Sequence, residues 1–249
     1  MAGHSKWANI KHRKGKQDAA RGKTFTKLIR EITVAAREGG GDESNNSRLR
    51  SAVLTAKSEN MPAANIDRAI KKGIGELDGE SYEAAIYEGY GPGGVAMFVD
   101  ALTDNKNRTV SEVRHLFNKH NGSMAESGAV AWVFEQKGLI VVPKEGVEED
   151  DLMLVALDAG AEDIVEEEDT FEVFTPVSET DVVRKAIEEA DISIERSELT
   201  RIPQNSVEIE GKTAQQLLTL MEMLEDNDDV QRVYANFDIS DEELATLTA

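Results

Sequence analysis

Apolar residues recur at helical spacing in three stretches near the start of the chain. The first stretch follows Thr24 and ends at three successive glycines, and its apolar positions are Phe25, Leu28, Ile29, Ile32 and Ala36. The second follows Asn46 or Ser47, and the third begins near Pro62, a residue suited to a first helical turn. This spacing predicts three short amphipathic helices with tight connections, which form a small helical bundle over residues 23–76.

After residue 80 the apolar residues alternate with polar ones, which is typical of strands. Residues 85–102 contain two such stretches with a Gly-Pro-Gly-Gly turn between them, and this pattern predicts a β-hairpin. The polar loop 103–108 follows, and then a helix whose expected inward face is Val110, Val113, Leu116 and Phe117. The apolar run at 129–135 predicts a further strand.

Residues 138–201 show strand and helix patterns in the order β-α-β-β-α-β. This is the order of the ferredoxin-like fold, which is a complete two-layer unit. The β-α-β pattern that remains, over 205–239, is too small to fold by itself, so we assign it to the domain that begins at residue 80. The fold class is therefore predicted to be α+β, with a basic flexible arm at 1–22, a helical domain at 23–76, a discontinuous middle domain at 80–136 plus 205–240, and an inserted ferredoxin-like domain at 137–204.

Charge is distributed unevenly along the 249 residues. The formal net charge is −20, and spread evenly this charge would repel nucleic acid. However, residues 1–75 hold 16 Lys or Arg against seven Asp or Glu, whereas residues 76–249 hold 12 against 41. Such asymmetry between two parts of a chain indicates contact of the basic part with nucleic acid.

Composition also excludes several classes of protein. The chain has no cysteine, which excludes disulfides, thiolate metal sites and a cysteine nucleophile. No apolar run approaches the roughly 18 residues of a membrane span, and the start of the chain lacks the apolar core of a secretory signal. The basic start resembles an organellar transit peptide in its low acid content, but its glycines and weak amphipathic periodicity count against that interpretation. We expect a cytoplasmic protein without a membrane partner.

The motifs of enzymes and cofactor sites are not evident. Glycine-lysine-threonine triplets occur at 22–24 and 211–213, but neither has the earlier glycine that a phosphate loop needs. The four histidines lack metal-ligand spacing, and the acid pairs lack the glycine of a calcium loop. No catalytic triad signature or dinucleotide fingerprint appears. We therefore expect no enzyme activity, no cofactor, no metal and no small-molecule substrate.

The basic stretch at the N-terminus is the main candidate for a binding site. Lysine and arginine neutralise phosphates, and an exposed aromatic ring offers a face on which an unpaired base can stack. The candidate contact residues are Lys6, Trp7, Lys11, His12, Arg13, Lys14, Lys16, Arg21, Lys23 and Lys27. Two other interpretations remain open, namely a solvated charged tail and a tail that folds back onto the acidic part of the chain.

A second candidate is the polar loop that opens onto the helix near residue 106. Backbone N–H groups at a helix N-terminus can hold an anion, and the polar residues Asn105, Asn107 and Arg108 lie at this point. The alternative is an ordinary helix N-cap, which the residue types favour from physics alone.

Several separated motifs closely resemble those of the YebC/PmpR family of bacterial proteins. They are GHSKWANIKHRKGKQDAARGKTFTKLIREI, NMPAANIDRAIKKG, YEGYGPGGVA, TDNKNRTVSEVRH and LEDNDDVQRVYANF, and the similarity extends over nearly the whole chain. The resemblance implies a three-domain architecture and a DNA-binding transcriptional regulator. It also implies a rival role, because relatives such as a mitochondrial translational activator of a cytochrome oxidase subunit are linked to the ribosome and to synthesis of proline-rich stretches. Residues 42–47 and 121–128 differ from the usual family forms.

We therefore predict a monomeric, non-enzymatic regulator that binds nucleic acid through its basic arm. The first hypothesis is duplex DNA as the partner, and the second is ribosomal RNA or the ribosome. A third hypothesis is a protein-interaction adaptor that uses the acidic ferredoxin-like domain. No recognition helix with base-reading side chains is evident in the sequence, so sequence-specific reading of DNA has weak support at this level.

Overall fold

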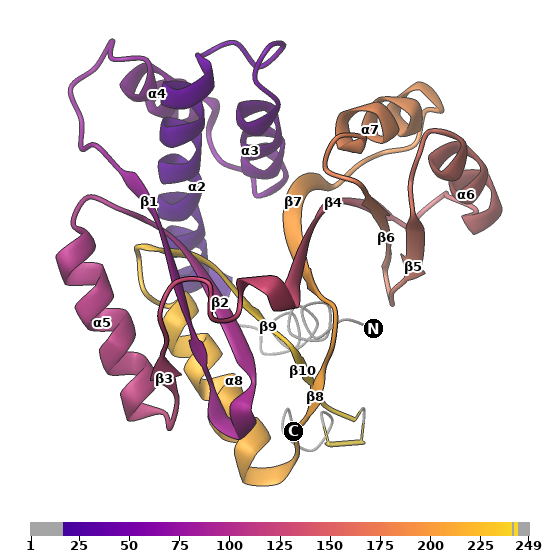
Figure 1. The fold of residues 1–249 in the computed structure, drawn as a ribbon. Helices are drawn as coiled ribbons and strands as arrows, with labels where there is room; N and C mark the ends of the chain where they lie inside the picture. The colour runs from indigo at the N-terminus through magenta and orange to yellow at the C-terminus, as the bar shows by residue number, and fades with distance from the viewer. Residues whose placement is uncertain (1–16, 241, 244–249) are drawn as a thin grey trace. The chain divides into compact units, whose positions relative to one another are not determined.

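A computed structural model of the chain describes residues 17–240, 242 and 243 (Figure 1). Helices and mainly antiparallel sheets are both present, and this confirms the α+β fold class. The contacts divide the chain into two compact units, one of residues 1–27, 80–135 and 202–249, and one of residues 28–79 and 136–201. The domain boundaries given above stay a prediction. None of the described helices is long and apolar enough to cross a membrane.

The N-terminal helices are α2 (Gln17–Gly39), α3 (Ser47–Ser58) and α4 (Ala63–Gly73). The prediction that the first helix begins at Thr24 was wrong, because α2 has 23 residues and begins at Gln17. Residues 17–21 lack large apolar groups in the sequence, but glutamine, alanine and arginine are strong helix formers, and their intrinsic propensity favours a longer helix. The cost of one glycine, at position 22, is about 1 kcal/mol and does not stop it.

Asn46 fixes the start of α3. Its side-chain oxygen accepts a hydrogen bond from the Leu49 N–H at 3.0 Å, which is the geometry of an N-cap. Its amide nitrogen donates to the Ala35 and Gly40 carbonyls, both at 2.8 Å. One buried polar side chain therefore caps α3 and also satisfies two carbonyls at the end of α2.

The middle part of the fold is a four-stranded sheet in the order β3-β1-β2-β9. The strands are β1 (Glu83–Tyr90), β2 (Ala96–Thr103), β3 (Ser123–Met124) and β9 (Val230–Ala235). The turn between β1 and β2 is a 3-10 turn, η1 (Pro92–Gly94), so the predicted hairpin is confirmed. Strand β9 comes from the C-terminal part of the chain and pairs antiparallel with β2, so two distant segments form one sheet.

Helices α5 (Lys106–Lys119) and α8 (Gly211–Glu225) cover one face of this sheet (Figure 1). They share a buried core with the strands that includes Val99, Val113, Phe117, Leu217, Leu220 and Val233. A parallel pair of two-residue strands, β8 (Val207–Glu208) and β10 (Phe237–Asp238), adds a small second sheet.

The segment that precedes β4 (Phe134–Pro143) covers part of the opposite face of the sheet. The prediction of a strand over 129–135 was wrong for residues 129–133, which form a bend followed by a 3-10 turn, η2 (Ala131–Val133), while residues 134 and 135 begin β4. The reason is Glu88, whose buried carboxylate accepts hydrogen bonds from the N–H groups of Gly128, Val130 and Ala131 at 2.6, 2.7 and 2.9 Å. These N–H groups converge on one carboxylate, and the apolar side chains pack on Phe98 instead of extending a ladder.

Strands β4 to β7, within residues 134–203, form a second four-stranded sheet in the order β5-β6-β4-β7. Its other elements are α6 (Glu149–Asp158), β5 (Asp163–Glu166), β6 (Thr170–Thr175), α7 (Thr180–Glu189) and β7 (Arg196–Pro203). The central strands β4 and β6 are antiparallel, as are β5 and β6. The element order and the strand order are those of the predicted ferredoxin-like fold, with Leu152, Val173, Val183 and Ile187 in its core.

Candidate nucleic-acid interface

Most of the predicted contact residues fall in the part of the chain that the structure does not describe. Lys6, Trp7, Lys11, His12, Arg13, Lys14 and Lys16 lie outside the described residues. Arg21 belongs to the first turns of α2. Of the predicted contact residues in the N-terminal segment, the structure describes the side chains of Lys23 and Lys27, which lie one helical turn apart on α2.

Lys23 and Lys27 both bind the C-terminal end of α8. The Lys23 ammonium lies 3.0 Å from an Asp226 carboxylate oxygen and donates to the Asp226 carbonyl at 3.3 Å. Lys27 donates to the Glu225 carbonyl at 2.6 Å. Helix α8 ends at Glu225, and the last carbonyls of a helix carry partial negative charge that a cation stabilises. The two lysines thus neutralise a helix terminus.

These contacts leave the two lysines unequally available to a ligand. The Lys23 side chain is 44% exposed and its partner Asp226 is 55% exposed. An exposed ion pair of this kind contributes only about 0–1 kcal/mol, so a phosphate can compete for Lys23. Lys27 is partly buried and donates to a carbonyl, so its contact is mainly structural. Their role in binding nucleic acid stays a prediction.

The loop before α5 has a clear structural role. Asn105 is the N-cap of α5, and its side-chain oxygen accepts a hydrogen bond from the Arg108 N–H at 3.1 Å. The Arg108 guanidinium donates to Asp104 at 2.7 Å and to Asp229 at 2.6 Å. The polar residues of this loop therefore start a helix and bind carboxylates of the protein itself, while Asn107 remains exposed.

Asp229 is the centre of this polar cluster and is 2% exposed. The same carboxylate oxygen that binds Arg108 also accepts hydrogen bonds from Thr103 at 3.0 Å and Thr109 at 2.6 Å. The hydrogen bond to Asp229, followed by the one to Asp104, raises the pKa of Arg108 above its ordinary value. A buried carboxylate with three donors is well satisfied, so this arginine neutralises an internal charge. Contact of Asn105, Asn107 or Arg108 with nucleic acid stays a prediction.

Charge in the helical segment is balanced and partly paired. Residues 28–79 hold eight Lys or Arg and eight Asp or Glu. Arg48 binds Glu31 at 2.7 Å and Glu38 at 2.6 Å, and Lys71 binds Asp67 at 2.8 Å. By contrast, residues 1–27 hold eight Lys or Arg against Asp18 alone. The excess positive charge of the N-terminal region is thus confined to its first 27 residues.

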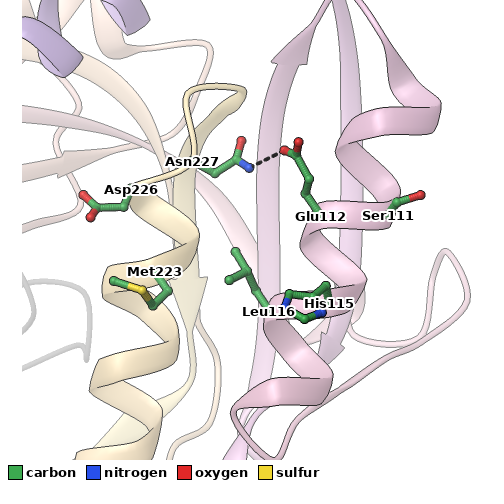
Figure 2. Close-up of a pocket in the computed structure, with 7 residues that line it drawn as sticks. All are labelled: Ser111, Glu112, His115, Leu116, Met223, Asp226 and Asn227. Carbon is green, nitrogen blue, oxygen red and sulfur yellow. Dashed lines mark hydrogen bonds between the residues drawn. The ribbon is translucent and has the colours of Figure 1, made fainter.

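A groove of about 450 Å³ lies between α5 and α8. Its lining residues are Ser111, Glu112, His115, Leu116, Met223, Asp226 and Asn227, and Figure 2 shows the two helices with these side chains between and beside them. The Asn227 amide donates to Glu112 at 2.7 Å across the groove. The lining carries two carboxylates, which disfavour a polyanion. Among the described residues, no group of three or more His, Asp or Glu side chains is placed to hold a metal ion.

Sequence reasoning missed the exposed Trp132, which lies beside the exposed Tyr90. Trp132 of η2 is 68% exposed, and Tyr90 at the end of β1 is 40% exposed. The Trp132 indole N–H donates to the Ala129 carbonyl at 3.0 Å, and the Tyr90 hydroxyl donates to the same oxygen at 3.4 Å. The exposure of Trp132 could not be found from the sequence, because this residue lies in an apolar run that suggests a buried strand.

The fold and the charge distribution define the class of protein. It is an α+β protein with a basic N-terminal segment, a helical region and two sheets, and it resembles a crystal structure titled as a conserved hypothetical protein from Aquifex aeolicus. That structure matches with a TM-score of 0.84 and 50% identity, over 90% of this chain and 93% of the other.

Family models and curated relatives identify the family. Residues 5–76 match the TACO1/YebC protein N-terminal domain, and residues 82–237 match the TACO1/YebC second and third domain. A relative from Desulfosudis oleivorans is 57% identical over 97% of this chain and 98% of its own length, and one from Geobacter sulfurreducens is 58% identical over 99% and 100%. Both relatives are named as probable transcriptional regulatory proteins. The chain belongs to the TACO1/YebC family, which confirms the resemblance drawn from its motifs.

Proposed function

We propose that this protein is a non-enzymatic, cytoplasmic regulator of gene expression that binds duplex DNA through residues 1–27. The observation that carries the proposal is the confinement of excess positive charge to this segment. It has eight Lys or Arg and one acid, whereas residues 28–79 are balanced and residues 80–249 hold 12 Lys or Arg against 39 Asp or Glu. The names of the curated relatives support a role in transcription.

The charge distribution sets how the protein approaches DNA. Lysine and arginine side chains in the basic segment neutralise phosphates and release condensed counterions, which supplies affinity without sequence preference. The acidic remainder of the chain is repelled by the same phosphates, so the protein binds with the basic segment toward the duplex. Lys23 can join this contact by exchanging Asp226 for a phosphate, because both side chains of that ion pair are substantially exposed.

A truncation tests the proposal most directly. Removal of residues 1–16 leaves α2 intact, because the helix starts at Gln17. The truncated and full-length proteins are compared for affinity to a 30-base-pair duplex over a range of salt. Since the removed segment holds five Lys or Arg, the slope of log affinity against log salt is expected to fall by up to about 4.5, at roughly 0.9 for each lost phosphate contact.

Two matched variants test whether duplex binding depends on where the positive charges lie or only on the net charge of the protein. Lys6, Lys11, Lys14 and Lys16 are changed to glutamine in one variant. The control changes Lys119, Lys144, Lys185 and Lys212, which lie outside the basic segment, to glutamine. Both variants lose four positive charges, but only the first is expected to lose affinity for the duplex. Equal losses in the two variants would show that net charge alone governs binding and would contradict the proposal.

Binding to ribosomes is measured with the same two proteins. Full-length and truncated proteins are co-sedimented with ribosomes at matched ionic strength. If truncation abolishes ribosome binding and leaves duplex affinity unchanged, the partner is ribosomal RNA rather than DNA, and the proposal fails in favour of a translation factor. If truncation changes neither affinity, residues 1–16 are not the contact segment, and the acidic ferredoxin-like part becomes the next candidate for a partner surface.

A further inference from the structure

Helix α4 presents a polar and basic face to solvent. Its buried residues are Ile66, Ala69 and Gly73, on the side that packs against the bundle. Ala64, Arg68 and Lys72 follow one another at intervals of four residues on the opposite side, and all three are exposed. Among the described residues, no hydrogen bond or ion pair from the side chains of Arg68 or Lys72 is found. Asp67 and Lys71, which pair with each other at 2.8 Å, also lie on the exposed side of the helix, so only part of the charge on this side is without a partner among the described residues.

The helix that carries this face is firmly held. Gly73 lies so close to α2 that an added Cβ would stand 2.5 Å from the Thr33 carbonyl and 2.6 Å from the Ala36 Cβ. The Thr33 hydroxyl is 3.3 Å from the Ala69 carbonyl, which adds a buried polar contact between the two helices. Because the backbones approach so closely, the outer face of α4 is presented in a fixed orientation.

The connection between α3 and α4 is a tight turn of residues 59–62 (Figure 1). Asn60 has a φ of 58°, in the left-handed region that asparagine tolerates at the end of a helix. The Met61 N–H donates to the Ala56 carbonyl at 2.8 Å, and Pro62 precedes the first residue of α4. A turn of three or four residues between two helices also occurs in helix-turn-helix DNA-binding motifs, in which the second helix lies in the major groove.

The residues on the outer face of α4 suit base edges. Asparagine pairs with adenine and arginine with the O6 and N7 atoms of guanine, while an alanine methyl contacts the methyl group of thymine. Ala64 and Arg68 are exposed, and Asn65 is half-buried at the edge of this face. They supply these three groups in the first two turns of α4, which are the turns that contact bases in such motifs. Lys72, one turn further on, is placed for a phosphate.

A plainer explanation covers only part of this pattern. Lysines in the last turn of a helix stabilise its partial negative charge, and this accounts for Lys71 and Lys72. Lys71 is also paired with Asp67, and the hydrogen bond to that carboxylate raises the pKa of Lys71. Neither argument explains Arg68, which lies in the middle of the helix.

We propose that α4 is a recognition helix that enters the major groove of duplex DNA, with Ala64, Asn65 and Arg68 at the base edges and Lys72 at a phosphate. The proposal rests on the proposed function, since the basic segment supplies the affinity and α4 adds sequence preference. The partner is a duplex, because an unpaired strand has no groove for a helix to enter.

The test starts from duplexes selected by the full-length protein from a random pool. Affinity is then measured for one selected duplex and for a shuffled duplex of the same composition. Arg68→Ala is expected to reduce the preference for the selected duplex by about 5- to 150-fold, the range for loss of one bidentate base contact. Arg68→Lys keeps the charge but not the fork of donors, so it is expected to lose preference while non-specific affinity stays the same.

Lys72→Ala tests the proposed phosphate contact, and Lys57→Ala is its control. Lys72→Ala is expected to weaken binding to both duplexes equally and to lower the salt slope by about 0.9. Lys57, on α3, is 3.9 Å from Glu43 and is the control for a nearby lysine whose loss is expected to change neither quantity. Circular dichroism of each variant verifies that the bundle has folded.

Two results would overturn the proposal. The first is selection that enriches no sequence, and the second is an Arg68→Lys variant that folds and discriminates as well as the unchanged protein. If either occurs while removal of residues 1–16 still weakens duplex binding, the proposed function stands and only the recognition helix is wrong. If the unchanged protein binds ribosomes but no duplex, both proposals fail together.

Discussion

The basic N-terminal segment and the loop before α5 both carry cations among polar residues, but their cations have different partners. In the loop, Arg108 binds Asp104 and Asp229, and Lys106 binds Glu83 at 2.7 Å. In residues 1–27, eight Lys or Arg face a single acid of the same segment, and only Lys23 and Lys27 have contacts that can be described. A polar loop at a helix N-terminus is therefore not a ligand site when nearby carboxylates already neutralise its cations.

The largest effect on stability is expected when Asp229, the carboxylate that binds Arg108, is replaced. Asp229→Ala leaves Thr103, Thr109 and Arg108 without their shared acceptor in a buried position. Loss of a buried carboxylate of this kind is expected to lower the free energy of unfolding by about 2–4 kcal/mol. Urea denaturation at neutral pH measures the change.

The control for Asp229→Ala is Asp78→Ala, at an exposed position, which is expected to change stability by less than about 0.5 kcal/mol. Equal destabilisation in the two variants would mean that the hydrogen bonds to Asp229 contribute little. In that case the loop would not be the self-neutralised region described above, and its cations would be available to a ligand.

Arg108→Gln removes the donor that binds Asp229 and leaves the carboxylate in place. The variant is expected to lose about 1–2 kcal/mol of stability, because one of three donors to Asp229 disappears while the two threonines remain. Its affinity for a duplex is expected to stay within about twofold of the unchanged protein, because the guanidinium is bound internally. Filter binding at two salt concentrations measures affinity. A fall comparable to that of the four arm lysines would place the loop in the interface and remove the contrast between the two regions.

Lys27 and Lys23 belong to the basic segment but, like the cations of the loop, bind groups of the protein itself, because each contacts the C-terminal end of α8. Lys27→Gln is expected to reduce stability by about 0.3–1 kcal/mol, the usual value of a cation at a helix C-terminus. Lys23→Gln is expected to change stability less and duplex affinity more, because that side chain is exposed. Lys212→Gln, at the opposite end of α8, is the matched control and lacks any favourable dipole contact. If Lys27→Gln instead has the larger effect on duplex affinity, its contact with α8 is not retained in solution.

Much of the fold could be predicted from the sequence because its signals are local. The ferredoxin-like unit is marked by strand and helix patterns that follow one another with short turns, and the structure has those elements in that order. The incomplete β-α-β pattern at the C-terminus indicated that this segment belongs with the domain that begins at residue 80, but it did not identify β2 as the partner of β9. The extent of α2 was missed because residues 17–22 have no apolar periodicity, although their intrinsic helix propensity is high.

The other errors and omissions arise from contacts between distant residues. A strand at 129–135 was a fair interpretation of an apolar run, but Glu88, about 40 residues away, binds its N–H groups. Likewise, nothing local to Lys27 indicates that its partner is the Glu225 carbonyl, 198 residues away. The exposed face of α4 was overlooked because Lys71 and Lys72 resemble an ordinary basic helix end, and only burial identifies which side Arg68 occupies.

The smallest expected effect concerns His120, the C-cap of α5, at the end of the helix opposite to Arg108. Burial lowers the pKa of His120 below its ordinary value of 6.5, and the positive charge of Lys119 acts in the same direction. Its buried Nε2 atom has no hydrogen-bond partner among the described residues. The charges at the two ends of α5 therefore differ, because carboxylates hold the cation at Arg108 whereas burial disfavours one at His120.

The sign of the pH dependence follows from this lowered pKa. Below about pH 6.5 a histidine in the unfolded chain binds a proton, while His120 in the folded protein stays neutral until the pH falls further. The contribution of His120 to stability is therefore complete above pH 6.5 and is lost as the pH falls through that value toward the lower folded pKa. Urea denaturation between pH 7.5 and 5 is expected to show a smaller loss of stability in His120→Asn than in the unchanged protein. If His120→Asn loses as much stability as the unchanged protein over this range, the buried imidazole is not what couples α5 to pH.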